Sequence, residues 1–255
     1  MSTLRLFTWG YWGWGTTAGR LIEAADAVEA ARGFRPPVFV DIRWKRQGRA
    51  ADFVGSRFES LLGGDRYRWL QGLGNKAIDD GGMEIARAQD AGLLLDLATT
   101  VAADRRRVVF FCACHEPKRP PRECHRCEVA RLVLAEAGRR GVRAETAEWP
   151  GGEPERRLIE LPVEASAKVR RGVKSIPLGG SPKLATWAAL PWYSVVTVRE
   201  RSGTDAVAVR SGPAVYRGGW CLPVFGEAVA PDEADTLLRE SAEVFVRDGF
   251  AVRTS

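Results

Sequence analysis

The chain has 255 residues, 45% of them hydrophobic, which is long for one domain and enough for two domains with sizeable cores. No apolar run approaches the roughly 20 residues that a membrane-spanning helix needs, and the N-terminus lacks a signal peptide's apolar segment and cleavage site. We therefore expect a cytoplasmic protein with no membrane partner and with reduced thiols. The net charge of +6 permits binding to phosphate-rich partners, although an arginine-favouring genome would produce the same balance.

Strand-like and helix-like segments alternate through residues 1–150. The predicted strands cover residues 4–9, 38–42, 67–70, 107–112 and 142–146. The predicted helices run between Thr17 and Gly33 and over residues 52–62, 91–103 and 124–137. This alternation predicts an α/β, Rossmann-like three-layer domain with a mostly parallel sheet.

The pattern changes after a glycine- and proline-rich linker at residues 149–154. Two strand-like segments, residues 193–200 and 206–210, flank a turn sequence and predict a hairpin. An amphipathic helix is predicted over residues 232–248. Residues 155–255 therefore read as a smaller α+β module.

Ligands of parallel α/β sheets bind beyond the carboxyl ends of the strands. The loops that follow Trp9, Asp41 and Cys112 leave such ends, so we expect them to converge on one hollow. Four of the five cysteines and both histidines lie between Cys112 and Cys127, beside this edge of the predicted sheet.

Cys124, His125 and Arg126 begin the last helix of the first domain. A helix start and a nearby arginine lower a thiol's pKa and favour anions, and histidine exchanges protons near neutral pH. The trio therefore suits a thiolate nucleophile or a phosphate pocket. In the alternative interpretation, Cys124 packs inward while His125 and Arg126 tie the loop to Asp41.

Cys112, Cys114, Cys124 and Cys127 also permit a zinc site, since thiolates are good zinc ligands and four of them close a tetrahedron. Residues two apart on a strand point to opposite faces of the sheet. Cys112 and Cys114 can therefore both bind a metal only if the strand ends by Cys112.

Asp41 and Arg43 are two residues apart after a buried strand, so both side chains can enter the same cleft. Asp41 could act as a base or orient His125. A purely structural Asp–Arg pair is the alternative.

Aromatic and basic residues in two loops suit contact with nucleic acid. Tyr11, Trp12 and Trp14 lie between glycines and could stack on bases, or could instead fill the gap between the domains. In the second loop, Trp44 is followed by Lys45 and Arg46, which combine stacking with attraction to phosphate.

The run of three arginines at residues 105–107 precedes a predicted strand. We expect it at the edge of the sheet opposite the site, as a solvated surface.

Five short motifs occur in order along residues 6 to about 148: Thr8-Trp-Gly-Tyr11, Asp41-Ile-Arg43, Leu73-Gly-Asn75, Cys112-Ala-Cys114 and Cys124-His-Arg126. In these motifs the chain resembles the DUF488 family, a prokaryotic group without an assigned function. The resemblance implies an α/β fold and a pocket formed by the shared motifs, which adds Asn75 to the expected ligand contacts. The proline-rich insert at residues 116–123 and the tryptophan-rich loop after Gly10 depart from the family pattern, and the last hundred residues lie outside it.

The function expected from these features is an enzyme that modifies, excises or repairs nucleic acid or nucleotides through a Cys-His-Arg pocket. Two alternatives remain open: a non-catalytic module that binds modified nucleotides or nucleic acid, and a zinc-stabilised scaffold within a complex.

Overall fold

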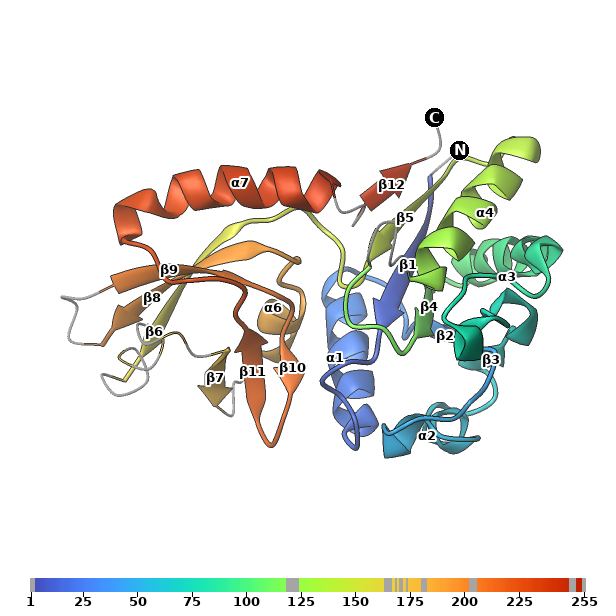
Figure 1. Ribbon diagram of the computed structural model, residues 1–255, viewed down its shortest axis with the longest axis horizontal. Helices are drawn as coiled ribbons and strands as arrows, with labels where there is room; N and C mark the ends of the chain where they lie inside the picture. The colour runs from blue at the N-terminus through green and yellow to red at the C-terminus, as the bar shows by residue number, and fades with distance from the viewer. Residues whose placement is uncertain are drawn as a thin grey trace. The chain divides into compact units, whose positions relative to one another are not determined.

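In the computed structural model the chain forms two compact units, residues 1–149 with 248–255 (unit 1) and residues 150–247 (unit 2) (Figure 1). The structure describes residues 3–117, 124–162, 167, 169, 172, 174–179, 183–201, 206–247 and 251–253. Among these residues, no helix has both the length and the apolar character that crossing a bilayer requires.

A six-stranded sheet forms the centre of unit 1. Its strands are β1 (Leu4–Gly10), β2 (Val38–Asp41), β3 (Tyr67–Trp69), β4 (Val108–Cys112), β5 (Ala144–Glu148) and β12 (Ala251–Arg253). Their order is β12-β5-β1-β4-β2-β3. β1 to β5 are mutually parallel, and β12 is antiparallel to β5, which confirms the predicted mostly parallel sheet.

Helices lie on both sides of this sheet (Figure 1). They are α1 (Ala18–Ala31), α2 (Arg57–Leu62), α3 (Ala91–Ala103) and α4 (His125–Arg139). Leu6 and Phe110 belong to one core cluster with side chains of α3 and α4. Trp9 and Phe111 contact Phe53 on the other face, since neighbouring strand residues point to opposite sides. The sheet between two helical layers is the predicted Rossmann-like arrangement.

The helix predicted over residues 52–62 is interrupted in the structure. A short 3₁₀ helix, η1 (Ala51–Phe53), precedes α2, and Gly55 between them has a φ of 57°. This left-handed conformation, which glycine adopts at no steric cost, breaks the helical backbone. The other 3₁₀ helices are η2 (Gln71–Leu73), η3 (Ile78–Asp80), η4 (Ala88–Asp90) and η5 (Pro231–Glu233).

Unit 2 contains two three-stranded sheets and two described α-helices. The strands are β6 (Arg156–Leu161), β7 (Ser175–Gly179), β8 (Ser194–Glu200), β9 (Ala206–Ser211), β10 (Val215–Tyr216) and β11 (Trp220–Pro223), and the helices are α6 (Leu184–Ala188) and α7 (Ala234–Arg247). β8 and β9 form the predicted antiparallel pair, whose turn at residues 202–205 lies outside the described residues. α7 packs on these two strands through Ala234 and Leu238.

The second domain was predicted to cover residues 155–255, whereas unit 2 ends at Arg247. Residues 248–255 belong to unit 1, because Ala251 pairs with Ala147 and β12 thereby covers the edge of β5. An exposed sheet edge carries unpaired backbone groups, and an added strand satisfies them. No local sequence pattern indicated this return of the chain.

Candidate functional site

The three strand ends predicted to converge are neighbours in the sheet. Gly10 pairs with Cys112, and Asp41 pairs with Phe111. Two further backbone hydrogen bonds hold the residues just after these strands. The Tyr11 N–H donates to the Cys112 carbonyl oxygen, and the Ile42 N–H donates to that of Phe111, each over 3.2 Å. The carboxyl edge of the parallel sheet therefore brings together the segments that carry the candidate side chains.

Two cysteines and a histidine form a buried cluster at this edge. The Sγ atoms of Cys112 and Cys124 are 3.2 Å apart, too far for a disulfide bond, and both thiols are free. One ligand atom from each of Cys112, Cys124 and His125 lies within 4.8 Å of the others. The cluster could therefore hold a metal ion.

The position of the strand end decides the part played by Cys114. β4 ends at Cys112, so Cys114 lies in the following loop, where its backbone N–H donates to Cys112 Sγ over 3.4 Å. Its side chain is exposed, and its thiol does not belong to the group of ligand atoms formed by Cys112, Cys124 and His125. Cys127, by contrast, packs against the apolar core as a partly buried side chain. Cys127 was expected as a metal ligand, but the ligand atom near Cys112 and Cys124 comes from His125.

Arg126 is the polar centre around which these groups are arranged. Its side chain is fully buried, and Nη1 contacts Cys112 Sγ at 3.3 Å and the Cys114 carbonyl oxygen at 2.9 Å. Nη2 donates to the His115 carbonyl over 3.2 Å and to Glu148 Oε1 over 2.9 Å. Because its nitrogens are used within the fold, Arg126 holds the loop after β4 and does not serve as an open phosphate contact.

Glu148 is the partner of Arg126, in place of the expected Asp41. Burial raises the pKa of Glu148 to about 7, although Arg126 and a hydrogen bond from Thr8 act in the opposite direction. Thr8 pairs with Glu148 in the strand register and donates its hydroxyl hydrogen to the carboxylate. The sequence did not single out this residue, because its strand also contains Glu145 and Thr146.

The two buried thiols share a hydrogen bond, and Arg126 Nη1 lies within 3.6 Å of both Sγ atoms. Burial opposes ionisation of Cys112, but hydrogen bonds from Cys114 and Cys124 and the charge of Arg126 lower its pKa well below the usual value. The hydrogen bond with Cys112 is the largest cause that raises the pKa of Cys124. The shared hydrogen bond thus favours the thiolate on Cys112, while the thiolate expected at Cys124 stays a prediction.

His125 and Asp41 do not form the expected pair. His125 Nε2 lies 3.2 Å from the carbonyl oxygen of Ile42. The Asp41 carboxylate accepts from Arg43 Nε at 2.9 Å, Arg43 Nη2 at 2.6 Å and the Tyr67 hydroxyl at 2.9 Å. Asp41 and Arg43 are thus a buried structural pair, completed by a tyrosine that the sequence interpretation missed.

The aromatic loop after β1 is less open than expected. Tyr11 is buried and stacks on Phe53, with ring centroids 4.3 Å apart. Trp14 is 2% exposed. Trp12 is half-buried, and its ring centroid lies 3.6 Å from that of His115. Base stacking by all three rings would require accessible faces, which Tyr11 and Trp14 do not have.

The basic loop after β2 remains on the surface, but its charges are partly compensated. Lys45 contacts Asp79 at 2.5 Å, and Arg46 contacts Glu59 at 2.8 Å. Trp44 is half-buried. Asn75, an expected ligand contact, instead holds its own loop, accepting from Glu84 N at 2.8 Å and donating to Gly82 O at 2.8 Å.

The fold and site together define an α/β protein with a buried thiol–imidazole cluster at the carboxyl edge of its parallel sheet. No family model matches the chain, and neither a curated protein nor a solved structure does. The resemblance to the DUF488 family thus stays a prediction from the motifs.

Proposed function

We propose that unit 1 is a zinc-dependent enzyme of the DUF488 type that acts on nucleic acid or nucleotides. The observation that supports it is the grouping of Cys112, Cys124 and His125, with three ligand atoms within 4.8 Å. Thiolates and imidazole are the preferred ligands of zinc, and three protein ligands leave a fourth position for water or substrate. When bound, zinc supplies a Lewis acid and an activated water.

The charges of the buried cluster favour a divalent cation. Arg126 carries one positive charge, while Glu148, Cys112 and Cys124 can carry three negative charges when all are ionised. Buried charges without compensation are costly. A zinc ion with both thiolates would bring this group to neutrality, since its two charges add to that of Arg126.

The surroundings of His125 also suit a metal ligand. Histidines that bind metals commonly donate their second ring N–H to a backbone carbonyl, which fixes the tautomer and the ring orientation. In the tautomer with its proton on Nε2, the 3.2 Å contact with Ile42 O is such a hydrogen bond, and Nδ1 carries the lone pair.

Cys114 supports a second candidate function, a closed structural zinc site. Its backbone N–H donates to Cys112 Sγ over 3.4 Å, so this residue lies beside the cluster, and its thiol could become a fourth ligand if the loop moved. A site with four protein ligands would stabilise the fold and leave no position for substrate. This corresponds to the zinc-stabilised scaffold considered from the sequence.

The metal content of the purified protein tests the centre directly. We expect the wild-type chain to retain zinc, measured by atomic spectroscopy after dialysis, and Cys112→Ser to lose it. Cys221→Ser is the matched control, because Cys221 lies in unit 2, outside the cluster. Loss of zinc in Cys114→Ser would favour the structural site, and retention would favour the catalytic one. A wild-type chain that stays metal-free after incubation with zinc would contradict both.

The proposed nucleic-acid substrate depends on the surface beside the cluster. The loop with Lys45 and Arg46 follows β2 at the same edge of the sheet, and the chain carries a net charge of +6. Ligands of parallel sheets bind at this edge.

Binding to single-stranded and duplex oligonucleotides should therefore weaken as salt rises. We expect Lys45→Gln to lower the slope of log affinity against log salt by about 1, the amount for one phosphate contact. Lys174→Gln in unit 2, which removes the same charge, should leave the slope unchanged. Absence of binding at low salt would remove nucleic acid as a partner and leave a metal enzyme for small molecules.

A further inference from the structure

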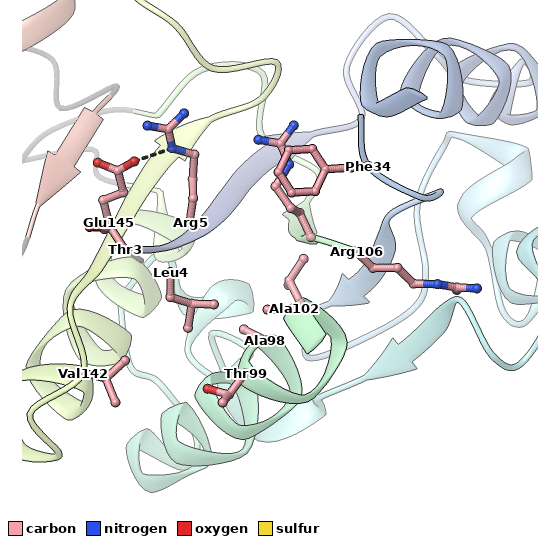
Figure 2. Close-up of a pocket in the computed structure, with 12 residues that line it drawn as sticks. Thr3, Leu4, Arg5, Phe34, Ala98, Thr99, Ala102, Arg106, Val142 and Glu145 are labelled. Carbon is pink, nitrogen blue, oxygen red and sulfur yellow. Dashed lines mark hydrogen bonds and ion pairs between the residues drawn. The ribbon is translucent and has the colours of Figure 1, made fainter. Parts of the chain in front are cut away.

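A cavity lies far from the cysteine cluster, at the amino ends of β1, β4 and β5 (Figure 2). Its volume is about 560 Å³, within the range of small-molecule sites. Much of its lining is apolar and comes from the strand starts and from α3, including Leu4, Ala98, Ala102, Val108 and Val142. The cysteine cluster occupies the opposite edge of the same parallel sheet.

The wall of this cavity contains a buried guanidinium with unused donors. Arg107 donates from Nε and Nη2 to Glu29, over 2.5 and 2.7 Å, and lies 4.1 Å from the ring centroid of Phe34. Its side chain is only 9% exposed. Arg107 lines the cavity, and the N–H groups on its Nη1 donate to no acceptor among the described residues.

Positive charge is concentrated around this wall. Arg5 also lines the cavity and bonds through Nε to Glu145 (Figure 2). Arg106 is the third arginine of the lining, and Glu145 is its one carboxylate, so the charged side chains that line the cavity are net positive.

We propose that this cavity binds a small organic acid, with its carboxylate at Arg107 and Arg5 and its apolar body against Leu4, Ala102 and Val142. A net positive lining suits an anionic ligand, and a guanidinium can donate two parallel hydrogen bonds to a carboxylate. A mainly apolar lining with a few convergent polar groups is typical of sites for such ligands. The site is independent of the proposed zinc centre, and two members of the arginine run expected to be a solvated surface, Arg106 and Arg107, line it.

Octanoate is the probe, and calorimetric titration of the full chain measures its binding. We expect saturable binding to the wild type and at least roughly tenfold weaker binding of uncharged 1-octanol, because it lacks the charge-assisted hydrogen bonds. Arg5→Gln should weaken octanoate roughly tenfold for the same reason. Ala102→Trp should abolish binding, since Ala102 is exposed and faces the cavity.

Ala103→Trp is the matched control for Ala102→Trp. Ala103 is also exposed on α3 but does not line the cavity, so this variant should bind octanoate like the wild type. Circular dichroism of each variant verifies folding. Equal octanoate affinity in the two tryptophan variants would overturn the proposal. Equal affinity for octanoate and 1-octanol, or no saturable binding to the folded wild type, would do the same.

Discussion

Replacing Arg126 with methionine should lower the free energy of unfolding of unit 1 by about 3–5 kcal/mol, the cost of breaking a buried ion pair by removing one partner. The guanidinium is fully buried and joins Glu148 to the carbonyl groups of Cys114 and His115. Methionine fills part of the volume but leaves the carboxylate and both carbonyls without their donor. Urea denaturation measures the difference from wild type.

The matched control is Arg131→Met on the same helix. Arg131 is exposed and pairs with Glu128 three residues earlier, so its loss should cost at most about 1 kcal/mol. Adding Glu148→Leu to Arg126→Met should recover much of the lost stability, because the unpaired carboxylate is then gone. Equal destabilisation by Arg126→Met and Arg131→Met would show that the buried pair does not hold the site together.

Gly10→Ala should disrupt the site although it adds only one methyl group. A Cβ atom at Gly10 would overlap the carbonyl oxygen of Cys114 and lie 2.9 Å from Arg126 Nη1. The backbone after β4 would have to move away, which separates Cys112 from its hydrogen-bond donors. We expect a loss of roughly 3 kcal/mol in unfolding free energy, at the upper end of overpacking effects, together with loss of bound zinc.

Gly138→Ala provides the comparison for Gly10→Ala. Gly138 lies within α4, and a Cβ atom there would meet nothing within 4 Å. Alanine in a helix interior is more stable than glycine by about 0.5–1 kcal/mol, so this variant should gain stability and keep its zinc. Unchanged stability and zinc content in Gly10→Ala would mean that the close approach of Gly10 to the loop after β4 is not required.

Some features of the site could be predicted because they depend on neighbours in the chain. The apolar run before Cys112 indicated a buried strand, and the alternation of strands with helices placed its end at a ligand-binding edge. Cys124 and His125 begin α4, the helix that follows β4 in the chain, so their approach to Cys112 at the end of β4 agrees with the alternation of strands and helices. The prediction of one helix over residues 52–62 was wrong, because Gly55 adopts a left-handed conformation that composition alone does not reveal.

The partners of the buried charges could not be predicted in the same way. Arg126 was expected near Asp41, yet it pairs with Glu148, because the register of β1 with β5 places Thr8 opposite Glu148. The Asp41 carboxylate instead accepts hydrogen bonds from Arg43 and Tyr67. Each of these pairings depends on which strands are adjacent, and the order of the strands is set by the packing of the whole sheet.

The amino-acid sequence by itself determined an α/β first unit, a carboxyl edge rich in thiols and imidazoles, and a distinct second unit, because periodicity and local clustering are properties of neighbouring residues. Only the tertiary structure decided that hydrogen bonds and Arg126 lower the pKa of Cys112, that His125 joins the cluster where Cys127 was expected, and that the chain's end returns to β5. A thiol's charge depends on the donors and the burial around it. Those donors come from segments that only folding brings together.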